Sequence, residues 1–437
     1  MQARPVRIAL LGCGTVGGGV VRLLYDNARY LAERVGAPLE IARVLVRDAT
    51  KERPAELDLR VVTTDAELVL GDASIDLYVE TMGGLDPARE YVERAIENKR
   101  GVVTANKMLL ATCGADLVDR ATAAGVDLAF EASVGGGIPI IRTLREALAS
   151  DWVTSLSGIV NGTCNFVLSR MREHGDTFDA AVKTAQELGY AEADPELDVG
   201  GHDAAHKLVV LAMLAFGARV AIDDVKPEGI RALEPIDHRF AKRFGYVIKH
   251  LAIGRDRDVA AIGGANGGEV ELRVHPALVR EGSTLASVSG VLNAIELEGR
   301  ALGPAVLIGR GAGAMPTAVS VVADVLDVAS ALRGNAAGLM TRGIQPRARR
   351  VASIESLRSR YYVRFRAQNR PGTLARIALA LGDANVVVEQ MVQEEEGGVA
   401  NIVLTTHEAV ESDVVRALAA IGAQPFSLGR ATLIRIA

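Results

Sequence analysis

The chain is poor in cysteine, in aromatic side chains and in long apolar runs. Its 437 residues include three cysteines and one tryptophan, and aromatic residues make up 4% of the total. Three widely spaced cysteines do not form a disulfide framework, so we expect a protein of the reducing cytoplasm. The apolar stretch at residues 208–216 has about half the length of a membrane span. We therefore expect neither a disulfide-stapled scaffold nor a membrane partner.

The chain also lacks an excess of charge of one sign. Lysine and arginine number 49 against 54 aspartates and glutamates, which gives a net charge of −5. Without a basic excess, we expect no nucleic-acid partner. Glycine, in contrast, is abundant with 45 residues. A chain of this length and composition predicts two or three domains of an α/β protein with tight glycine turns.

The first 132 residues alternate between short apolar segments and helical patterns. This alternation predicts a Rossmann-like, doubly wound parallel sheet that binds a dinucleotide. We expect helices at residues 90–98 and 115–124, and strands at residues 6–11, 39–46, 61–64, 75–80, 101–104 and 127–131.

The pattern changes after residue 132. Residues 133–304 are expected to form an α+β domain, and residues 305–335 to return to the first lobe; the resemblance described below implies that this domain serves catalysis, substrate binding and dimerisation. Residues 333–356 are polar and basic and are interpreted as a linker. Residues 357–437 read strand-helix-strand-strand-helix-strand, which is a ferredoxin-like βαββαβ unit, with its last strand expected at residues 426–436.

The strongest local motif is a G-x-G-x-x-G turn directly after the first predicted strand. It comprises Gly12, Gly14 and Gly17, with Thr15 and Val16 between them. Such glycines let the backbone approach a pyrophosphate, and the N–H groups at the start of the following helix receive its charge. The motif predicts a nicotinamide dinucleotide site.

The residues after the second predicted strand bear on the choice of dinucleotide. Arg47, Lys51 and Arg53 surround Asp48. An acidic residue at this place is typical of NAD sites and an arginine of NADP sites. Three cations around one carboxylate favour NADP, although Asp48 leaves NAD open.

Residues 189–207 form the densest group of ionisable side chains. The stretch contains five carboxylates, and the last of them, Asp203, lies on a predicted helix four positions before Lys207 and on the same face. The residues after Lys207 are apolar, so its ammonium is expected to be partly desolvated and suited to donate a proton. His202 and His206 have the spacing of metal ligands, but no third ligand is evident.

Two further residues invite catalytic interpretations. Lys107 follows the strand expected at residues 101–104, at the edge of the sheet where ligands bind. Cys164 could be a nucleophile, although no base is evident near it and small buried thiols are common.

Several of these segments together resemble homoserine dehydrogenase. Residues 80–84, 131–140, 158–165 and 309–317 accompany the glycine turn, residues 104–107 and residues 189–207, so the resemblance covers essentially the whole chain. The stretch 189–207 matches the family nearly position by position. Asn369-Arg370-Pro371-Gly372 introduces a unit that looks like an ACT domain, a type that binds small effectors, often amino acids.

The resemblance implies reduction of L-aspartate 4-semialdehyde to L-homoserine with NADPH, on the route to threonine and methionine. It implies that Lys207 is the acid, that Asp203 orients it, and that Glu192 pairs with the substrate ammonium. It also implies a homodimer or homotetramer and an amino-acid effector, threonine being the family's usual inhibitor. Further substrate contacts would come from Lys107, Tyr190 and Asp198, and further cofactor contacts from Arg47, Thr81, Thr104, Lys107, Gly189 and Gly313.

The resemblance further implies a monovalent-cation site, with sodium as the expected ion, at Glu131, Val134, Gly136 and Ile138. Residues 309–314 read GRGAGA where many members carry another glycine, so a methyl group is expected to tighten the cofactor edge. Two alternatives stay open: a phosphorylating semialdehyde dehydrogenase that uses Cys164, and a sensor of nucleotide and amino acid without turnover.

Overall fold

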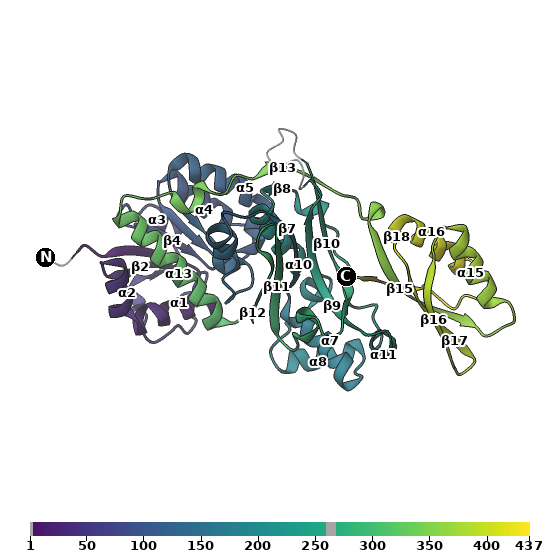
Figure 1. Ribbon diagram of the computed structural model, residues 1–437. Coiled ribbons are helices and arrows are strands. Elements are labelled where there is room, and N and C mark those ends of the chain that lie inside the picture. Colours follow the sequence, from purple (N-terminus) through teal and green to yellow (C-terminus); the bar gives the residue numbers. More distant parts are fainter. Residues whose placement is uncertain (1–2, 259–267) are drawn as a thin grey trace.

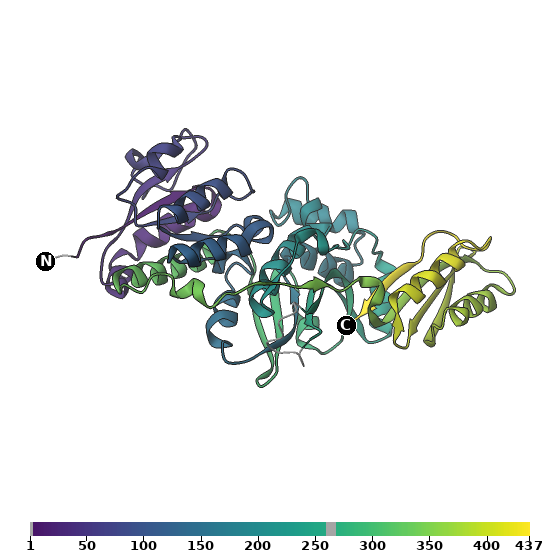
Figure 2. The same ribbon diagram turned by 90° about the horizontal axis from the view of Figure 1, so that it is seen from above.

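The computed structural model describes residues 3–258 and 268–437, which form an elongated molecule of three units (Figure 1). We call them the N-terminal, middle and C-terminal units. The N-terminal and C-terminal units lie at opposite ends, and the view from above shows the middle unit between them (Figure 2).

Six parallel strands form the sheet of the N-terminal unit, in the order β3-β2-β1-β4-β5-β6. The order of the strands reverses its direction between β1 and β4, and ligands bind at such a switch point beyond the carboxyl ends of the strands. This order confirms the predicted Rossmann-like sheet. The strands are β1 Val6–Leu11, β2 Leu39–Leu45, β3 Val62–Thr63, β4 Leu77–Glu80, β5 Gly101–Thr104 and β6 Leu128–Ala129.

Helices cover both faces of this sheet. One face carries α1 (Thr15–Asp26), α2 (Ala28–Val35) and α13 (Ala314–Arg333); the other carries α3 (Ala66–Leu70), α4 (Ala88–Glu97) and α5 (Lys107–Ala124). Helix α13 comes from beyond the middle unit, so the chain does return to the first lobe.

Helix α13 is long and apolar enough to cross a bilayer by composition. Its apolar side nevertheless packs into the N-terminal unit, where Val321 and Val325 are fully buried. A Cβ on Gly19 would lie 2.9 Å from the carbonyl oxygen of Ala314, so glycine permits the close approach of α1 and α13. Core packing therefore accounts for the composition of α13.

The middle unit is built on an antiparallel sheet in the order β12-β11-β7-β9-β10. Its strands are β7 Val153–Ile159, β9 Tyr246–Asp256, β10 Glu269–Arg280, β11 Leu292–Gly299 and β12 Gly303–Arg310. The helices used below are α6 Ile140–Arg142, α7 Gly162–His174, α8 Phe178–Glu187, α9 Glu196–Val199, α10 His202–Ala215 and α11 Pro235–Arg243.

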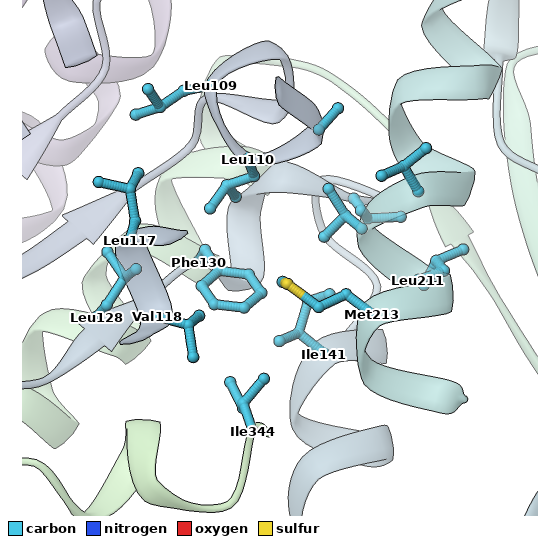
Figure 3. Packing of buried hydrophobic residues seen from close by; sticks show 14 of the residues in the cluster. Leu109, Leu110, Leu117, Val118, Leu128, Phe130, Ile141, Leu211, Met213 and Ile344 are labelled. Atoms are coloured by element: carbon cyan, nitrogen blue, oxygen red, sulfur yellow. The ribbon is translucent and has the colours of Figure 1, made fainter. Parts of the chain in front are cut away.

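Helix α10 joins the middle unit to the N-terminal unit through a shared apolar core. Leu110 of α5, Phe130, and Leu211 and Met213 of α10 pack together with Ile344 (Figure 3). Because one core spans both units, the N-termini of α5 and α10 are held in a fixed relation. These two helix starts carry Lys107 and Lys207.

The C-terminal unit has the predicted βαββαβ order. Its sheet runs β19-β15-β17-β16, and α15 and α16 cover one face. Edge strand β19 also pairs with β10, so the sheets of the middle and C-terminal units are continuous. The elements are β15 Arg358–Gln368, α15 Thr373–Asp383, β16 Val388–Glu396, β17 Val399–Thr406, α16 Glu411–Gly422 and β19 Thr432–Ile436.

Three segments differ from the sequence-based expectation. Helix α5 begins at Lys107 rather than near residue 115, because the Asn106 side chain accepts a hydrogen bond from Leu109 N and caps it. The last strand covers Thr432–Ile436 and not residues 426–436. The segment 333–356 is packed against the body: Thr341 Oγ1 accepts from Leu128 N at 2.9 Å, and Arg350–Val351 pairs with β10.

Candidate active site

The glycine turn between β1 and α1 is built as a cradle. Gly12 has φ of +93°, and a Cβ on Gly17 would collide with the carbonyl oxygen of Gly12. At Gly14, no heavy atom of the described residues lies within 4 Å of a Cβ position, so this side is open to a ligand. Thr15 and Val16 form the first turn of α1. These residues fit a dinucleotide pyrophosphate at the helix start.

The carboxyl ends of β4 and β5 are tied to this turn. Thr81 Oγ1 donates to Gly12 O at 2.8 Å. The buried Glu80 carboxyl group accepts from Thr104 Oγ1 at 2.5 Å and from Met82 N at 2.7 Å. Burial raises the pKa of Glu80. Thr81 and Thr104 thus lie at the predicted cofactor edge, and Glu80 joins the strands that carry them.

The charged residues after β2 differ in what they contact. Asp48 accepts from Thr50 Oγ1 at 2.6 Å and from Thr50 N at 2.9 Å, and these hydrogen bonds lower its pKa. Arg53 donates to Asp48 O at 2.7 Å and to Cys13 O, so it ties this segment to the glycine turn. Arg47 and Lys51 are exposed.

The centre of the site is one carboxylate between two lysines. Asp203 Oδ1 lies 2.7 Å from Lys107 Nζ, and Asp203 Oδ2 lies 2.7 Å from Lys207 Nζ. Lys207 Nζ also donates to Val160 O at 2.6 Å. The side chain of Asp203 is 3% exposed, that of Lys207 10% and that of Lys107 37%. The structure therefore brings together all three residues predicted to be catalytic.

The two lysines have opposite pKa shifts. Burial lowers the pKa of Lys207 and the charge of Lys107 adds to this, so the attraction of Asp203 does not restore the ordinary value. Burial also acts on Lys107, but the charges of Asp203, Asp198 and Glu192 outweigh it and leave its pKa raised. Asp203 has its pKa well below the ordinary value, because both lysines outweigh its burial.

Asn161 holds two carboxylates in place and was not among the predicted site residues. Its Nδ2 donates at 2.8 Å to Asp198 Oδ1 and at 2.8 Å to Asp203 Oδ2. Its Oδ1 accepts from Cys164 N and caps α7. Thr163 Oγ1 lies 3.1 Å from Asp198 Oδ2. The N-terminus of α7 therefore orders the same carboxylates that face the lysines.

The acidic loop before α9 remains open to solvent. Gly189 has φ of +73°, and the Tyr190 ring is 44% exposed and lies edge-on to Phe166 at 5.1 Å. Glu192 is exposed, and its charge contributes to the raised pKa of Lys107. The loop thus places the Glu192 carboxylate where its charge acts on Lys107, and leaves the Tyr190 side chain open to solvent.

Cys164 does not have the surroundings of a nucleophile. It is fully buried, and burial raises its thiol pKa well above the ordinary value. Its Sγ donates to Asp198 O at 3.2 Å. His202 is exposed and His206 is partly buried; among residues 3–258 and 268–437, no cluster of three His, Cys, Asp or Glu side chains is placed to bind a metal.

Two buried carboxyl groups lie beside the loop expected to bind a cation. Glu131 accepts from Ile141 N at 2.9 Å and from Arg142 N at 2.8 Å, and its own N–H donates to Asp324 Oδ2 at 2.7 Å. Burial raises the pKa of Glu131, and raises that of Asp324 to about 7. Asp324 Oδ1 has no hydrogen-bond partner in the described structure.

The loop itself is buried and rich in positive φ. Val134, Gly136 and Ile138 are buried, and Gly136 has φ of +51°. A Cβ on Gly136 would lie 2.6 Å from the carbonyl oxygen of Gly311, so the loop packs against residues 309–314. Gly313, with φ of +122°, leads from that segment into α13.

Comparisons with known proteins agree with this geometry. Residues 139–326 match the family model "Homoserine dehydrogenase", residues 12–131 its NAD binding domain, and residues 361–424 the ACT domain. A homoserine dehydrogenase of Pseudomonas aeruginosa is 40% identical over 99% of each chain, and one of Neisseria gonorrhoeae is 40% identical over the same shares. The crystal structure of a homoserine dehydrogenase from Thiobacillus denitrificans covers 100% of this chain and 99% of its own, with 42% identity and a TM-score of 0.92. The chain belongs to the homoserine dehydrogenase family and carries a nicotinamide-dinucleotide domain and a C-terminal ACT domain.

Proposed function

We propose that this oxidoreductase uses NADPH to reduce L-aspartate 4-semialdehyde to L-homoserine, and that Lys207 supplies the proton. The observation that carries this proposal is the Lys107–Asp203–Lys207 triad, in which Lys207 is the buried lysine and the one of the two lysines whose pKa is lowered. A lysine of lowered pKa gives up its proton more readily near neutral pH.

In the proposed reaction Lys207 transfers the proton, and Asp203 and Val160 orient its ammonium group. A dinucleotide held at the glycine turn (Gly12, Gly14 and Gly17) would supply the hydride that reduces the aldehyde carbon, and the carbonyl oxygen would then need a proton. Lys207 transfers a proton from Nζ to that oxygen, which yields the hydroxyl of the product. Val160 O and Asp203 accept two hydrogen bonds of Nζ and leave its third N–H for the substrate. In the oxidation direction, neutral Lys207 takes the proton back.

The surrounding charges suit an amino-acid substrate. Lys107, which stays positively charged, would bind the substrate carboxylate, and Glu192 would pair with its ammonium group. Asp198 and Tyr190 would complete the contacts from the loop that Asn161 and Thr163 order. A zwitterionic substrate would thus meet one residue of each sign, Lys107 for its carboxylate and Glu192 for its ammonium group.

The cofactor preference follows from the residues after β2. Asp48 is already engaged by Thr50, whereas Arg47 is exposed and suits a 2′-phosphate. Gly189 and Gly313 would lie against the nicotinamide end. Arg47→Ala is expected to weaken binding of NADPH and to leave binding of NADH unchanged. Equal loss for both dinucleotides would assign Arg47 a role in folding of the segment.

The loop 134–138 would hold a monovalent cation, with sodium as the expected ion. Its backbone carbonyl groups and Glu131 supply the oxygen ligands that hard cations prefer. Two buried carboxyl groups, Glu131 and Asp324, lie beside the loop, and Asp324 Oδ1 has no hydrogen-bond partner in the described structure, with Arg142 Nη2 4.0 Å away. The ion would fix the loop against residues 309–314, near the start of α13.

The ACT domain would bind an amino-acid effector, with threonine as the candidate, in a cytoplasmic homodimer or homotetramer. The presence of the domain and its Asn369-Arg370-Pro371-Gly372 turn support this assignment. Threonine inhibition that persists after substitutions at this turn would contradict it.

The reaction is tested by following NADPH oxidation with L-aspartate 4-semialdehyde for the wild type and for Lys207→Ala. We expect turnover in the wild type, its collapse in the variant, and unchanged NADPH binding in both. Equal turnover in both would assign the acid elsewhere, with Lys107 the next candidate. Cys164→Ser should remain active, because a fully buried thiol with a raised pKa forms no thioester.

A further inference from the structure

A short segment, residues 227–230, which we call the strut, packs against the loop proposed to bind substrate (residues 189–203, the substrate loop). Residues 227–230 run beside β10: Pro227 bridges to Val274, and Glu228 N donates to Val274 O at 2.8 Å. On its other side, Ile230 N donates to Val199 O at 2.9 Å, at the end of α9. The strut therefore joins the central sheet to the turn between α9 and α10, next to Asp198 and Asp203.

The contact between strut and turn is tight. A Cβ on Gly229 would collide with Val199 O and would lie 2.9 Å from Gly200 Cα. Gly201, which has φ of +88°, would place a Cβ 3.1 Å from Pro227 and 3.2 Å from His250. His250 Nε2 in turn lies 3.0 Å from Glu228 O. Because these contacts leave no free space between the strut and the turn, displacement of the strut displaces the start of α10.

The side chain of Glu228 reaches the ACT domain. Arg435 of β19 binds it through two parallel hydrogen bonds, Nη1 to Oε2 at 2.9 Å and Nη2 to Oε1 at 2.7 Å. Arg435 also binds Glu411, at the start of α16, with Nε to Oε2 at 2.9 Å. The side chain of Arg435 is 4% exposed, so this guanidinium is a buried link between the two units.

A second buried arginine provides a natural comparison. Arg364 of β15 lies 2.7 Å from Asp237 and 3.0 Å from Glu234, both of the middle unit. Glu234 is 52% exposed and Glu228 45% exposed, so the two glutamates are alike in exposure and in partner. Only Glu228 belongs to the strut that contacts the substrate loop.

We propose that Arg435 of the ACT domain is a positioning residue for the active site, which acts through Glu228 and the strut 227–230 on the substrate loop. The proposal rests on the assignment of substrate binding to residues 189–203. The ACT domain is then part of the support of the active site. A shift of β19 against β10, as an effector would produce, changes substrate affinity before it changes proton transfer.

The test compares Glu228→Ala with Glu234→Ala in the full-length protein. Each substitution removes one carboxylate from a buried arginine that keeps a second one, Glu411 or Asp237, so both variants should fold. For Glu228→Ala we expect KM for L-homoserine to rise about three- to tenfold at nearly unchanged kcat and KM for the dinucleotide, which corresponds to loss of one hydrogen-bonded contact. Glu234→Ala should leave all three constants unchanged. An equal rise in both variants, or none in Glu228→Ala, would overturn the proposal.

A second measurement does not depend on turnover. Amide hydrogen exchange of residues 198–203 should accelerate in Glu228→Ala and remain at the wild-type rate in Glu234→Ala. Faster exchange without a change in KM would show that the strut supports the turn and that the substrate does not bind there, which places the failure in the proposed substrate site. Unchanged exchange would contradict the strut itself. Gly229→Ala, whose Cβ collides with Val199 O, should give the larger effect on both readouts.

Discussion

The starts of α5 and α10 present the same side chain to the same carboxylate and give it different properties. Lys107 belongs to the N-terminal unit and is partly exposed, whereas Lys207 belongs to the middle unit and is almost fully buried. Both lie 2.7 Å from Asp203. Burial dominates the pKa of Lys207 and lowers it, while nearby carboxylates dominate that of Lys107 and raise it. The shared partner Asp203 therefore does not set the direction of the pKa shift; the depth of burial and the remaining neighbouring charges do.

Removal of the Lys207 amine is the strongest test of the proposed difference between the two lysines. Lys207→Ala should lower kcat by about 10²- to 10⁴-fold, the range of general acid catalysis. Binding of NADPH, measured by fluorescence titration, should be unchanged. Lys183→Ala, at an exposed lysine of α8 paired with Glu187, serves as the control for loss of one positive charge. A loss of turnover from Lys107→Ala greater than that from Lys207→Ala would reverse the assignment.

Removal of the shared charge should affect both lysines. Asp203→Asn keeps an acceptor oxygen for only one of the two ammonium groups, turns an NH2 group toward the other, and removes the charge that attracts both, so we expect kcat to fall by about ten- to a hundredfold. Substrate binding should weaken as well, because the pKa of Lys107 falls without Asp203. Steady-state kinetics would measure the loss of activity, and thermal unfolding at the wild-type temperature would show that the loss does not come from misfolding. Retention of wild-type kcat would show that the triad is not needed as a unit.

The role of Asn161 in holding the carboxylates of Asp198 and Asp203 can be tested without loss of its helix cap. Asn161→Asp keeps the oxygen that accepts from Cys164 N but loses the two donors to Asp198 and Asp203. We expect KM for the semialdehyde to rise about tenfold, because a third carboxylate then repels the other two. Thr177→Ala, at the cap of α8, shows what ordinary loss of a helix cap does to KM. Because Asn161→Asp keeps its cap, an unchanged KM in that variant would show that Asn161 only caps α7.

The smallest effect concerns the pH dependence. In the proposed mechanism reduction needs protonated Lys207, so its rate should decline as pH rises through the lysine pKa, which lies below the ordinary value. In Lys107→Gln a neighbouring positive charge is lost, the pKa of Lys207 rises, and the decline should move upward by about half a unit to one unit. Lys107→Arg keeps the charge and should leave the profile in place. A downward movement in Lys107→Gln would contradict the electrostatic assignment.

The sequence predicts the lysines and their carboxylate because they lie in compact motifs. Asp203 and Lys207 share one helix turn, and Lys107 follows a strand of a recognisable sheet. Asn161 escaped prediction because its partners lie 37 and 42 positions away, and nothing in a single sequence indicates which amide faces which carboxylate. The link between Glu228 and Arg435 spans 207 positions and crosses two units. Contacts of that kind depend on tertiary packing, which local patterns do not contain.

The continuous sheet also has a consequence for biosynthesis of the chain. The segment of β10 at Ala277 and Leu278 pairs with residues of β19, which the ribosome adds roughly 160 positions later. At about 5–20 residues per second, this part of β10 waits roughly ten to thirty seconds for its neighbour. An unpaired strand edge is a template for association with other chains. Newly made molecules therefore pass through a period in which their middle unit is exposed to misassembly, and chaperones that shield strand edges should raise the yield of active enzyme.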